Sequence, residues 1–160
     1  MPSDAELVRE FTAETGNVIP TEPQVMTKDE VYFLVKMMLD EIMELCATVA
    51  DPLEAKYNMI KMICDSKDIS KINGSDSLII AEQVDSVVDC YYYTLNAMAK
   101  KGVNFSKVFN LVHDANMDKR DPITKKFIRR EDGKILKRNG WIAPDVEEEI
   151  KKQIKEGSWT

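Results

Sequence analysis

Glycine, proline, histidine and cysteine are all scarce in this chain. Its 160 residues include 6 glycines, 6 prolines, 3 cysteines and 1 histidine. So few turn-forming residues favour helices, because a many-stranded β protein needs a turn after every short strand. The cysteines are odd in number and lack CxxC spacing, so we expect reduced, buried thiols rather than a disulfide framework at Cys46, Cys64 and Cys90.

Two further absences concern membranes and nucleic acids. No apolar run approaches the roughly 20 residues that span a bilayer, and the acidic N-terminal stretch lacks the apolar segment of a signal peptide. The formal net charge is −6, whereas a general nucleic-acid binder presents a basic face. We therefore expect a cytoplasmic protein that binds neither membranes nor nucleic acid.

Apolar residues recur at helical spacing through the first three quarters of the chain. Capping boxes begin at Ser3 and Thr27, and Gly102 is placed to end a helix. The expected helices span residues 3–15, 27–50, 52–64, 77–100 and 104–120. Such a series predicts an all-α fold, an antiparallel helical bundle that forms one domain over residues 1–120.

The remaining residues, 121–160, form a basic tail. Asp132-Gly133 is a strong turn dipeptide, which predicts a short β-hairpin over residues 126–138. A last charged helix is expected from Val146 to Glu156. We expect this hairpin and helix to pack on the helical domain.

Carboxylates gather on two of the expected helices. They are Asp40, Glu41 and Glu44 on one helix and Glu82, Asp85 and Asp89 on the other. A solvated helical face normally carries lysine or arginine one turn from its acids, yet residues 37–55 and 72–99 contain no basic residue. Oxygen ligands without histidine suit Mg²⁺ or Mn²⁺, so the pattern indicates a metal site, with an ordinary charged surface as the alternative.

The order of these motifs resembles one family of enzymes. The chain carries Asp40-Glu41-x-x-Glu44, then Glu82-x-x-Asp85, then Asn116-x-x-Lys119, and finally Gly133-Lys134-x-x-Lys137 followed by Pro144. This series resembles the all-α nucleoside triphosphate pyrophosphohydrolases, the MazG-like and phosphoribosyl-ATP pyrophosphohydrolase-like group. The chain departs from the pattern at Asp40, where the family has a glutamate, and in a longer spacer between the two acidic motifs.

The resemblance implies a function and a site. Mg²⁺, or Mn²⁺, would be held by Glu41, Glu44, Glu82 and Asp85, and Asp40 or Glu41 would orient or deprotonate the water that attacks the α-phosphorus. The monophosphate and pyrophosphate would be the products. The implied substrate contacts are Asn116, Lys119, Asp89, Tyr92, Lys134 and Lys137. The role would be clearance of damaged nucleotides or shaping of the dNTP pool.

Partners and alternatives follow from the same features. Methionine- and tyrosine-rich helix faces, together with the resemblance, suggest a homodimer or a dimer of dimers, and a well-packed monomer remains open. His113 is expected to be a surface or hydrogen-bonded residue outside the site. A non-enzymatic helical oligomeric adaptor with a residual metal-binding cluster is the alternative function, and the presence of Asn116 and Lys119 favours the enzyme.

Overall fold

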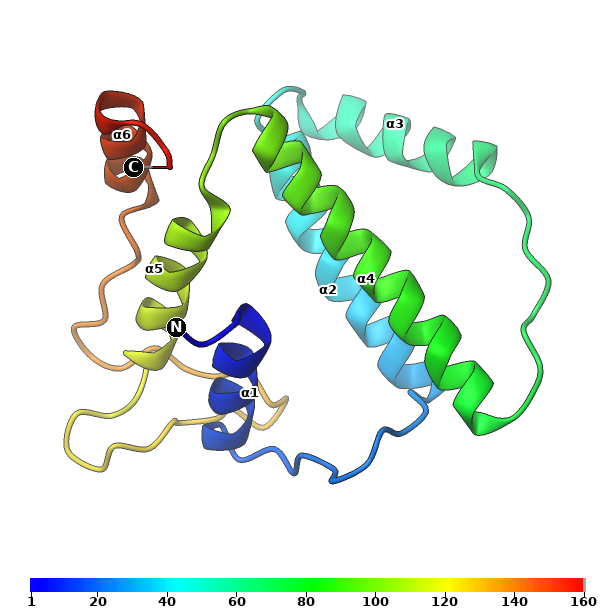
Figure 1. The fold of residues 1–160 in the computed structure, drawn as a ribbon, viewed down its shortest axis with the longest axis horizontal. Coiled ribbons are helices and arrows are strands. Elements are labelled where there is room, and N and C mark those ends of the chain that lie inside the picture. The colour runs from blue at the N-terminus through cyan, green and yellow to red at the C-terminus, as the bar shows by residue number, and fades with distance from the viewer. Residues whose placement is uncertain (160) are drawn as a thin grey trace. The chain divides into compact units, whose positions relative to one another are not determined.

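The chain folds into helices joined by irregular segments. The computed structural model describes residues 1–159, and the regular structure in this range consists of α1 (Asp4–Glu14), α2 (Lys28–Cys46), α3 (Pro52–Asp65), α4 (Asp76–Lys100), α5 (Phe105–Met117) and α6 (Val146–Glu156) (Figure 1). No strand occurs in this range, so the predicted all-α class is confirmed. None of these helices is long and apolar enough to cross a membrane.

The helices begin where the capping residues predict. The Ser3 and Thr27 side chains each accept a hydrogen bond from the third helical N–H group, and the Glu6 and Glu30 carboxylates accept one in return. These reciprocal bonds satisfy N–H groups that a helix cannot pair internally. Hydrogen bonds from the backbone N–H groups of Ser3 and Thr27 lower the pKa of Glu6 and Glu30 below the ordinary 4.5.

Helix α2 is shorter than predicted. It ends at Cys46 rather than near Ala50, and the next residues form a tight turn. The Thr48 hydroxyl and N–H both donate to the Leu45 carbonyl, at 2.7 and 3.1 Å. A threonine side chain that bonds nearby backbone competes with helix continuation, and this local competition is what the apolar periodicity missed.

The predicted β-hairpin over residues 126–138 is wrong. The described chain holds one isolated antiparallel bridge here, between Arg129 and Ile135. The predicted turn does form, and the Asp132 carboxylate accepts hydrogen bonds from the Arg130 guanidinium, which lowers the pKa of Asp132 to about 2. A two-stranded hairpin without a third strand or a packed face is marginal in water, so the ladder stops after one bridge.

The described residues divide into two compact units. One comprises Met1–Thr21 and the residues from Val88 onward, and the other comprises Glu22–Val87. The boundary falls inside α4, so one helix contributes to both. The charge pattern suggests a helical domain over residues 1–120 and a basic tail over residues 121–160. That division stays a prediction.

In the first unit, α5 packs against α1 and α6. Phe11 of α1 meets Phe127 edge to face, with ring centroids 5.3 Å apart. Gln153 of α6 is buried, and its amide accepts from the N–H of Asn104 at 2.9 Å and donates to the carbonyl of Asn104 at 3.2 Å. The side chain therefore satisfies both backbone groups of the residue that caps α5.

In the second unit, α3 leads away from the end of α2, and the segment 66–75 returns to the start of α4 (Figure 1). The Gln83 amide of α4 bonds the backbone N–H and carbonyl of Met26, at 2.9 and 3.0 Å. The Cα atoms of α2 and α4 nevertheless stay more than 8 Å apart. Gln83 thus joins α4 to Met26, in the segment that precedes α2.

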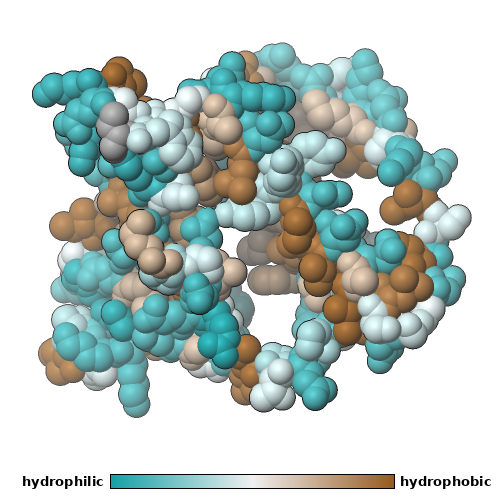
Figure 2. Space-filling model, viewed as in Figure 1, coloured by the Kyte–Doolittle hydropathy of each residue, from teal (hydrophilic) through white to brown (hydrophobic). Residues whose placement is uncertain are grey.

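Most apolar side chains of the described chain remain accessible. Ala55 is its only fully buried apolar residue, whereas Leu53 on the same helix is 82% exposed. Figure 2 shows hydrophobic side chains at the surface. The expectation that the cysteines are buried is wrong for Cys64 and Cys90, which are exposed free thiols, because no other helix packs over their faces.

Replacing Gln153 by alanine is expected to lower the free energy of unfolding by about 1–3 kcal/mol, because both backbone groups of Asn104 lose a buried partner. Denaturant unfolding followed by circular dichroism measures this change. Lys152→Ala, which removes an exposed neighbour on α6, should change stability by less than about 0.5 kcal/mol. Equal stability of the two variants would contradict the structural role of the Gln153 amide.

Candidate active site

The predicted site residues fall into an acidic group and a basic group. The proposed metal ligands Glu41 and Glu44 lie on α2, and Glu82 and Asp85 lie on α4, all within residues 22–87. The proposed phosphate ligands Asn116, Lys119, Lys134 and Lys137 belong to the unit that contains α5. Each group is described below by its own contacts.

The four proposed metal ligands are exposed and have no partner. Over residues 1–159, no cation pairs with Glu41, Glu44, Glu82 or Asp85, and no hydrogen bond reaches their carboxylates. The i, i+3 spacing puts two carboxylates on one face of each helix. Within the described chain, however, no three acidic, histidine or cysteine side chains come close enough to hold one metal ion.

The chemistry of this donor set fits a hard cation. The ligands are carboxylate oxygens, and lysine or arginine does not neutralise them, so Mg²⁺ or Mn²⁺ is the matching metal. The sequence motifs are present as predicted, and their assignment as one metal site stays a prediction.

Asp40 differs from the other acids of α2. Its carboxylate forms an ion pair with Lys36, one helical turn earlier. Lys36 lies just before the stretch without basic residues, so the motif spacing did not predict this pair.

Asp89 and Tyr92 lie on the part of α4 that follows Val87. Both are exposed, and neither side chain has a hydrogen bond or ion pair with the described residues. The neighbouring Tyr91 does: its hydroxyl donates to Asp4 Oδ2 at 2.5 Å, and this bond raises the pKa of Tyr91 above 10.0. The substrate contacts predicted for Asp89 and Tyr92 stay predictions.

The basic residues do come together. Lys119 Nζ donates to Asn116 Oδ1 at 2.7 Å. The expected helix over residues 104–120 ends earlier, at Met117, so this bond spans the end of α5 and does not lie on one helical face. The pKa of Lys119 is lowered from 10.5, first by partial burial and then by the nearby charges of Lys137 and Lys134. Lysine charges that act on one another in this way favour a polyanionic ligand, because an anion would relieve their mutual repulsion.

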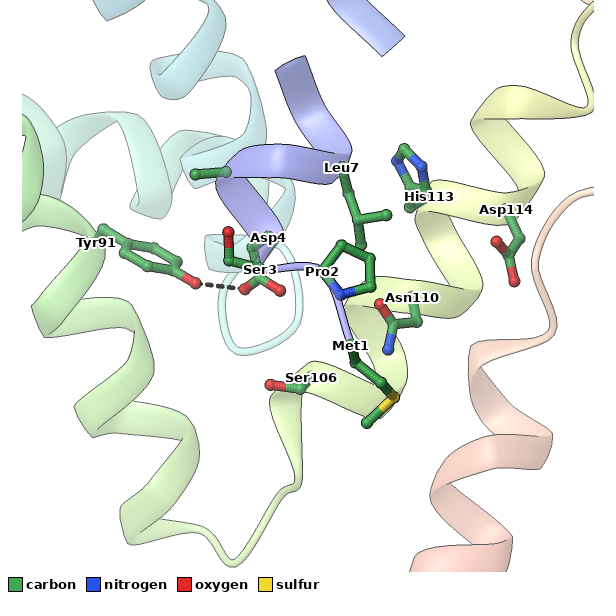
Figure 3. Close-up of a pocket in the computed structure, with 11 residues that line it drawn as sticks. Met1, Pro2, Ser3, Asp4, Leu7, Tyr91, Ser106, Asn110, His113 and Asp114 are labelled. Atoms are coloured by element: carbon green, nitrogen blue, oxygen red, sulfur yellow. Dashed lines mark hydrogen bonds between the residues drawn. The ribbon is translucent and has the colours of Figure 1, made fainter. Parts of the chain in front are cut away.

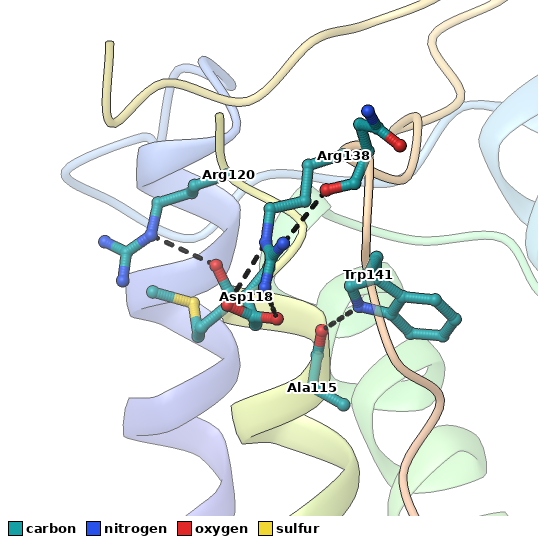
Figure 4. A network of polar contacts seen from close by, with 7 residues as sticks. Ala115, Asp118, Arg120, Arg138 and Trp141 are labelled. Carbon is teal, nitrogen blue, oxygen red and sulfur yellow. Dashed lines mark hydrogen bonds and ion pairs between the residues drawn. The ribbon is translucent and has the colours of Figure 1, made fainter. Parts of the chain in front are cut away.

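Trp141 belongs to this basic group, and the motif analysis missed it. Its indole N–H donates to the Ala115 carbonyl at 2.6 Å (Figure 4). Lys137 Nζ lies 4.4 Å and Lys119 Nζ 5.5 Å from the ring centroid, within the range of cation–π attraction. An isolated tryptophan in a polar, basic segment was the available signal, but no spacing rule singled it out.

An ion pair holds the same segment at the end of α5. The Arg138 guanidinium donates to Asp118 Oδ2 at 2.6 Å and to the Asp118 carbonyl at 2.8 Å (Figure 4). Arg120 donates to the Met117 carbonyl at 3.1 Å. Cations at the carboxyl end of a helix offset the partial negative charge of its free carbonyls. This end therefore fixes the chain around Lys134–Trp141.

A pocket of about 740 Å³ lies between the start of α1, the face of α5 and Tyr91 (Figure 3). His113, predicted to be exposed or hydrogen-bonded, is buried at 8% exposure and lines this pocket. Its ring is covered because α1 packs on α5, an interaction that the sequence did not reveal. None of the predicted metal or phosphate ligands lies on the pocket wall.

The helical fold, the paired carboxylates and the Asn-x-x-Lys element together define the class of all-α nucleoside triphosphate pyrophosphohydrolases. The family described as phosphoribosyl-ATP pyrophosphohydrolase matches residues 8–116, and this chain belongs to that family.

A solved structure shares the fold. It is a protein from Exiguobacterium sp. 255-15 described as a "putative NTP pyrophosphohydrolase", which is similar with a TM-score of 0.78 and 21% sequence identity over 97% of this chain and 98% of that chain. At this identity the likeness establishes the fold alone. No curated protein matches the sequence.

Binding of inorganic tripolyphosphate without metal is expected to weaken as the pH rises toward the lowered pKa of Lys119. The ammonium loses its proton, and hence its attraction for phosphate, at a lower pH than an ordinary lysine. Lys119→Arg should retain binding at high pH because a guanidinium stays charged. Calorimetric titration across pH measures this, with Lys152→Arg as the control. Identical pH profiles for the parent and Lys119→Arg would contradict the assignment.

Proposed function

We propose that this protein hydrolyses a nucleoside or deoxynucleoside triphosphate to its monophosphate and pyrophosphate, with Mg²⁺ as cofactor and Mn²⁺ as a possible substitute. The observation that carries the proposal is the isolation of Glu41, Glu44, Glu82 and Asp85 on α2 and α4, none of which has a cationic partner among residues 1–159. Family membership supports the reaction class.

Glu41, Glu44, Glu82 and Asp85 would hold the cation. A bound Mg²⁺ neutralises triphosphate charge and lowers the pKa of a coordinated water. Asp40, once released from Lys36, or a free oxygen of Glu41 would orient that water toward the α-phosphorus and accept its proton. Like-charged acids one helical turn apart repel each other and destabilise the helix. Binding of a cation between them would offset this repulsion.

The basic group would bind the phosphate chain. Asn116 lies in the last turn of α5 and Lys119 just beyond its end, and Lys134 and Lys137 follow the turn at Gly133. Ammonium groups stabilise the charge that builds up on pyrophosphate as the anhydride bond breaks. In this proposal Asp89 and Tyr92, both exposed on α4, contact the sugar or base.

We also propose a homodimer or a dimer of dimers. On α3, Leu53, Tyr57 and Ile60 are 82, 68 and 62% exposed. An apolar helix face of this extent is unusual on a monomer and is typical of subunit interfaces. A second copy would cover these faces, and sedimentation equilibrium measures the resulting mass.

A non-enzymatic oligomeric adaptor is the second candidate. It is favoured by the finding that no three acids of the described chain form a metal-sized group. The basic group argues for the enzyme, because an adaptor has no need for the Asn116–Lys119 pair or for Lys137 beside it. Release of pyrophosphate from a panel of nucleotides distinguishes the two.

Turnover is expected to require a divalent cation, since the acidic ligands cannot bind a triphosphate without one. Titration with EDTA should abolish pyrophosphate release, and added Mg²⁺ should restore it. Chromatography of the products should show the monophosphate. Activity in excess chelator, or successive release of orthophosphate with a diphosphate product, would place the protein in another reaction class.

Glu41→Gln, Glu44→Gln, Glu82→Gln and Asp85→Asn are each expected to lower kcat/KM at least about 100-fold. The fold should persist, because removing one of several like charges relieves repulsion. Asp40→Asn should cause a smaller or comparable loss. Glu54→Gln, an exposed acid in the first turn of α3, is the matched control. Near-normal turnover in any of the four variants would remove that residue from the ligand set.

A further inference from the structure

The indole of Trp141 lies beside two like charges. Lys119 and Lys137 both lie within cation–π distance of the ring, and the charge of Lys134 acts on Lys119 as well. Repulsion would drive flexible lysine side chains apart in water. Some attractive group must therefore keep these ammonium ions together when no anion is bound.

The acidic groups near the lysines do not supply that attraction. Asp118, at the end of α5, is paired with Arg138 at 2.6 Å, and Asp132 is paired with Arg130. The side-chain oxygen of Asn116 accepts a hydrogen bond from Lys119 and from no other lysine of the described residues. The ring of Trp141 is thus the neighbour that Lys119 and Lys137 share.

An aromatic ring has a property that a carboxylate lacks. Its face attracts cations electrostatically, but it does not neutralise them or occupy their N–H donors with strong acceptors. A carboxylate in this position would form ion pairs and compete with an incoming phosphate. An indole holds the ammonium groups while leaving them charged and able to donate.

The indole itself is held in place. Its N–H donates to the Ala115 carbonyl of α5 at 2.6 Å, and Arg138, three residues earlier, is bonded to Asp118. Trp141 is half-buried, whereas Trp159 is 73% exposed. The ring is therefore attached to the same helix end that carries Asn116 and Lys119.

We propose that Trp141 is a positioning residue for a polyphosphate site, holding Lys119 and Lys137 side by side so that both engage the same phosphate chain. The inference rests on the proposed function and deepens it, because it adds a residue that selects polyphosphate over single phosphate groups. The chemical class of ligand is a linear polyphosphate, as in a nucleoside triphosphate.

The test uses calorimetric titration of the full-length protein with inorganic tripolyphosphate and, separately, with orthophosphate, without metal. Trp141→Leu removes the ring face, and we expect tripolyphosphate to bind about 5- to 30-fold more weakly. Trp141→Phe keeps a ring face but loses the indole N–H, and it should retain most of the affinity. Trp159→Leu is the control and should bind as the parent does.

Two comparisons separate positioning from a purely structural role. If the hydrogen bond to Ala115 were all that mattered, Trp141→Phe would lose as much affinity as Trp141→Leu, and the proposal would be overturned. In a double-mutant cycle with Lys137→Ala, the losses should be less than additive because the ring acts through the lysines. Additive losses would also overturn it.

This inference and the proposed function can fail separately. Unchanged binding in Trp141→Leu, with clear binding by the parent, would refute the role of the ring and leave the lysine site intact. No binding of tripolyphosphate by the parent would refute both the lysine site and the inference. If the Trp141 variants bind tripolyphosphate as expected but the protein hydrolyses no nucleotide, only the hydrolase assignment is refuted.

Discussion

The carboxyl end of α5 is the constraint on which the basic half of the protein depends. Its free carbonyls accept hydrogen bonds from Arg138, Arg120 and Trp141. A helix end without such donors would leave unsatisfied backbone groups with a partial negative charge. Because the tail supplies Arg138 and Trp141 as donors, it is attached to the end of α5, and Lys119 and Lys137 both lie near the ring of Trp141.

The carboxylates on α2 and α4 are placed differently from the basic residues. They are arranged by helix geometry alone, at i, i+3 on α2 and on α4, and the described residues offer them no cation. One acid, Asp40, is engaged by Lys36. The other four, Glu41, Glu44, Glu82 and Asp85, are the carboxylates for which a metal ion is proposed.

Much of the fold could be predicted because its signals are local. The capping boxes at Ser3 and Thr27 and the side-chain cap at Asn104 place the helix starts correctly, since a cap needs only residues three positions away. Two local predictions failed: α2 ends at Cys46, next to the turn in which Thr48 bonds the Leu45 carbonyl, and the turn at Asp132 does not extend into strands. A competing side-chain bond decided the first outcome, and the lack of a neighbouring strand decided the second.

The sequence by itself determined the helices, the family motifs and the pairing of Asn116 with Lys119, because all of these depend on residues a few positions apart. Only the tertiary structure decided that Lys119 and Lys137 both lie within cation–π distance of Trp141, and that His113 is covered by α1. These contacts join residues separated by many positions or by irregular chain. No periodicity encodes such distances, because packing and hydrogen bonds between separate segments set them.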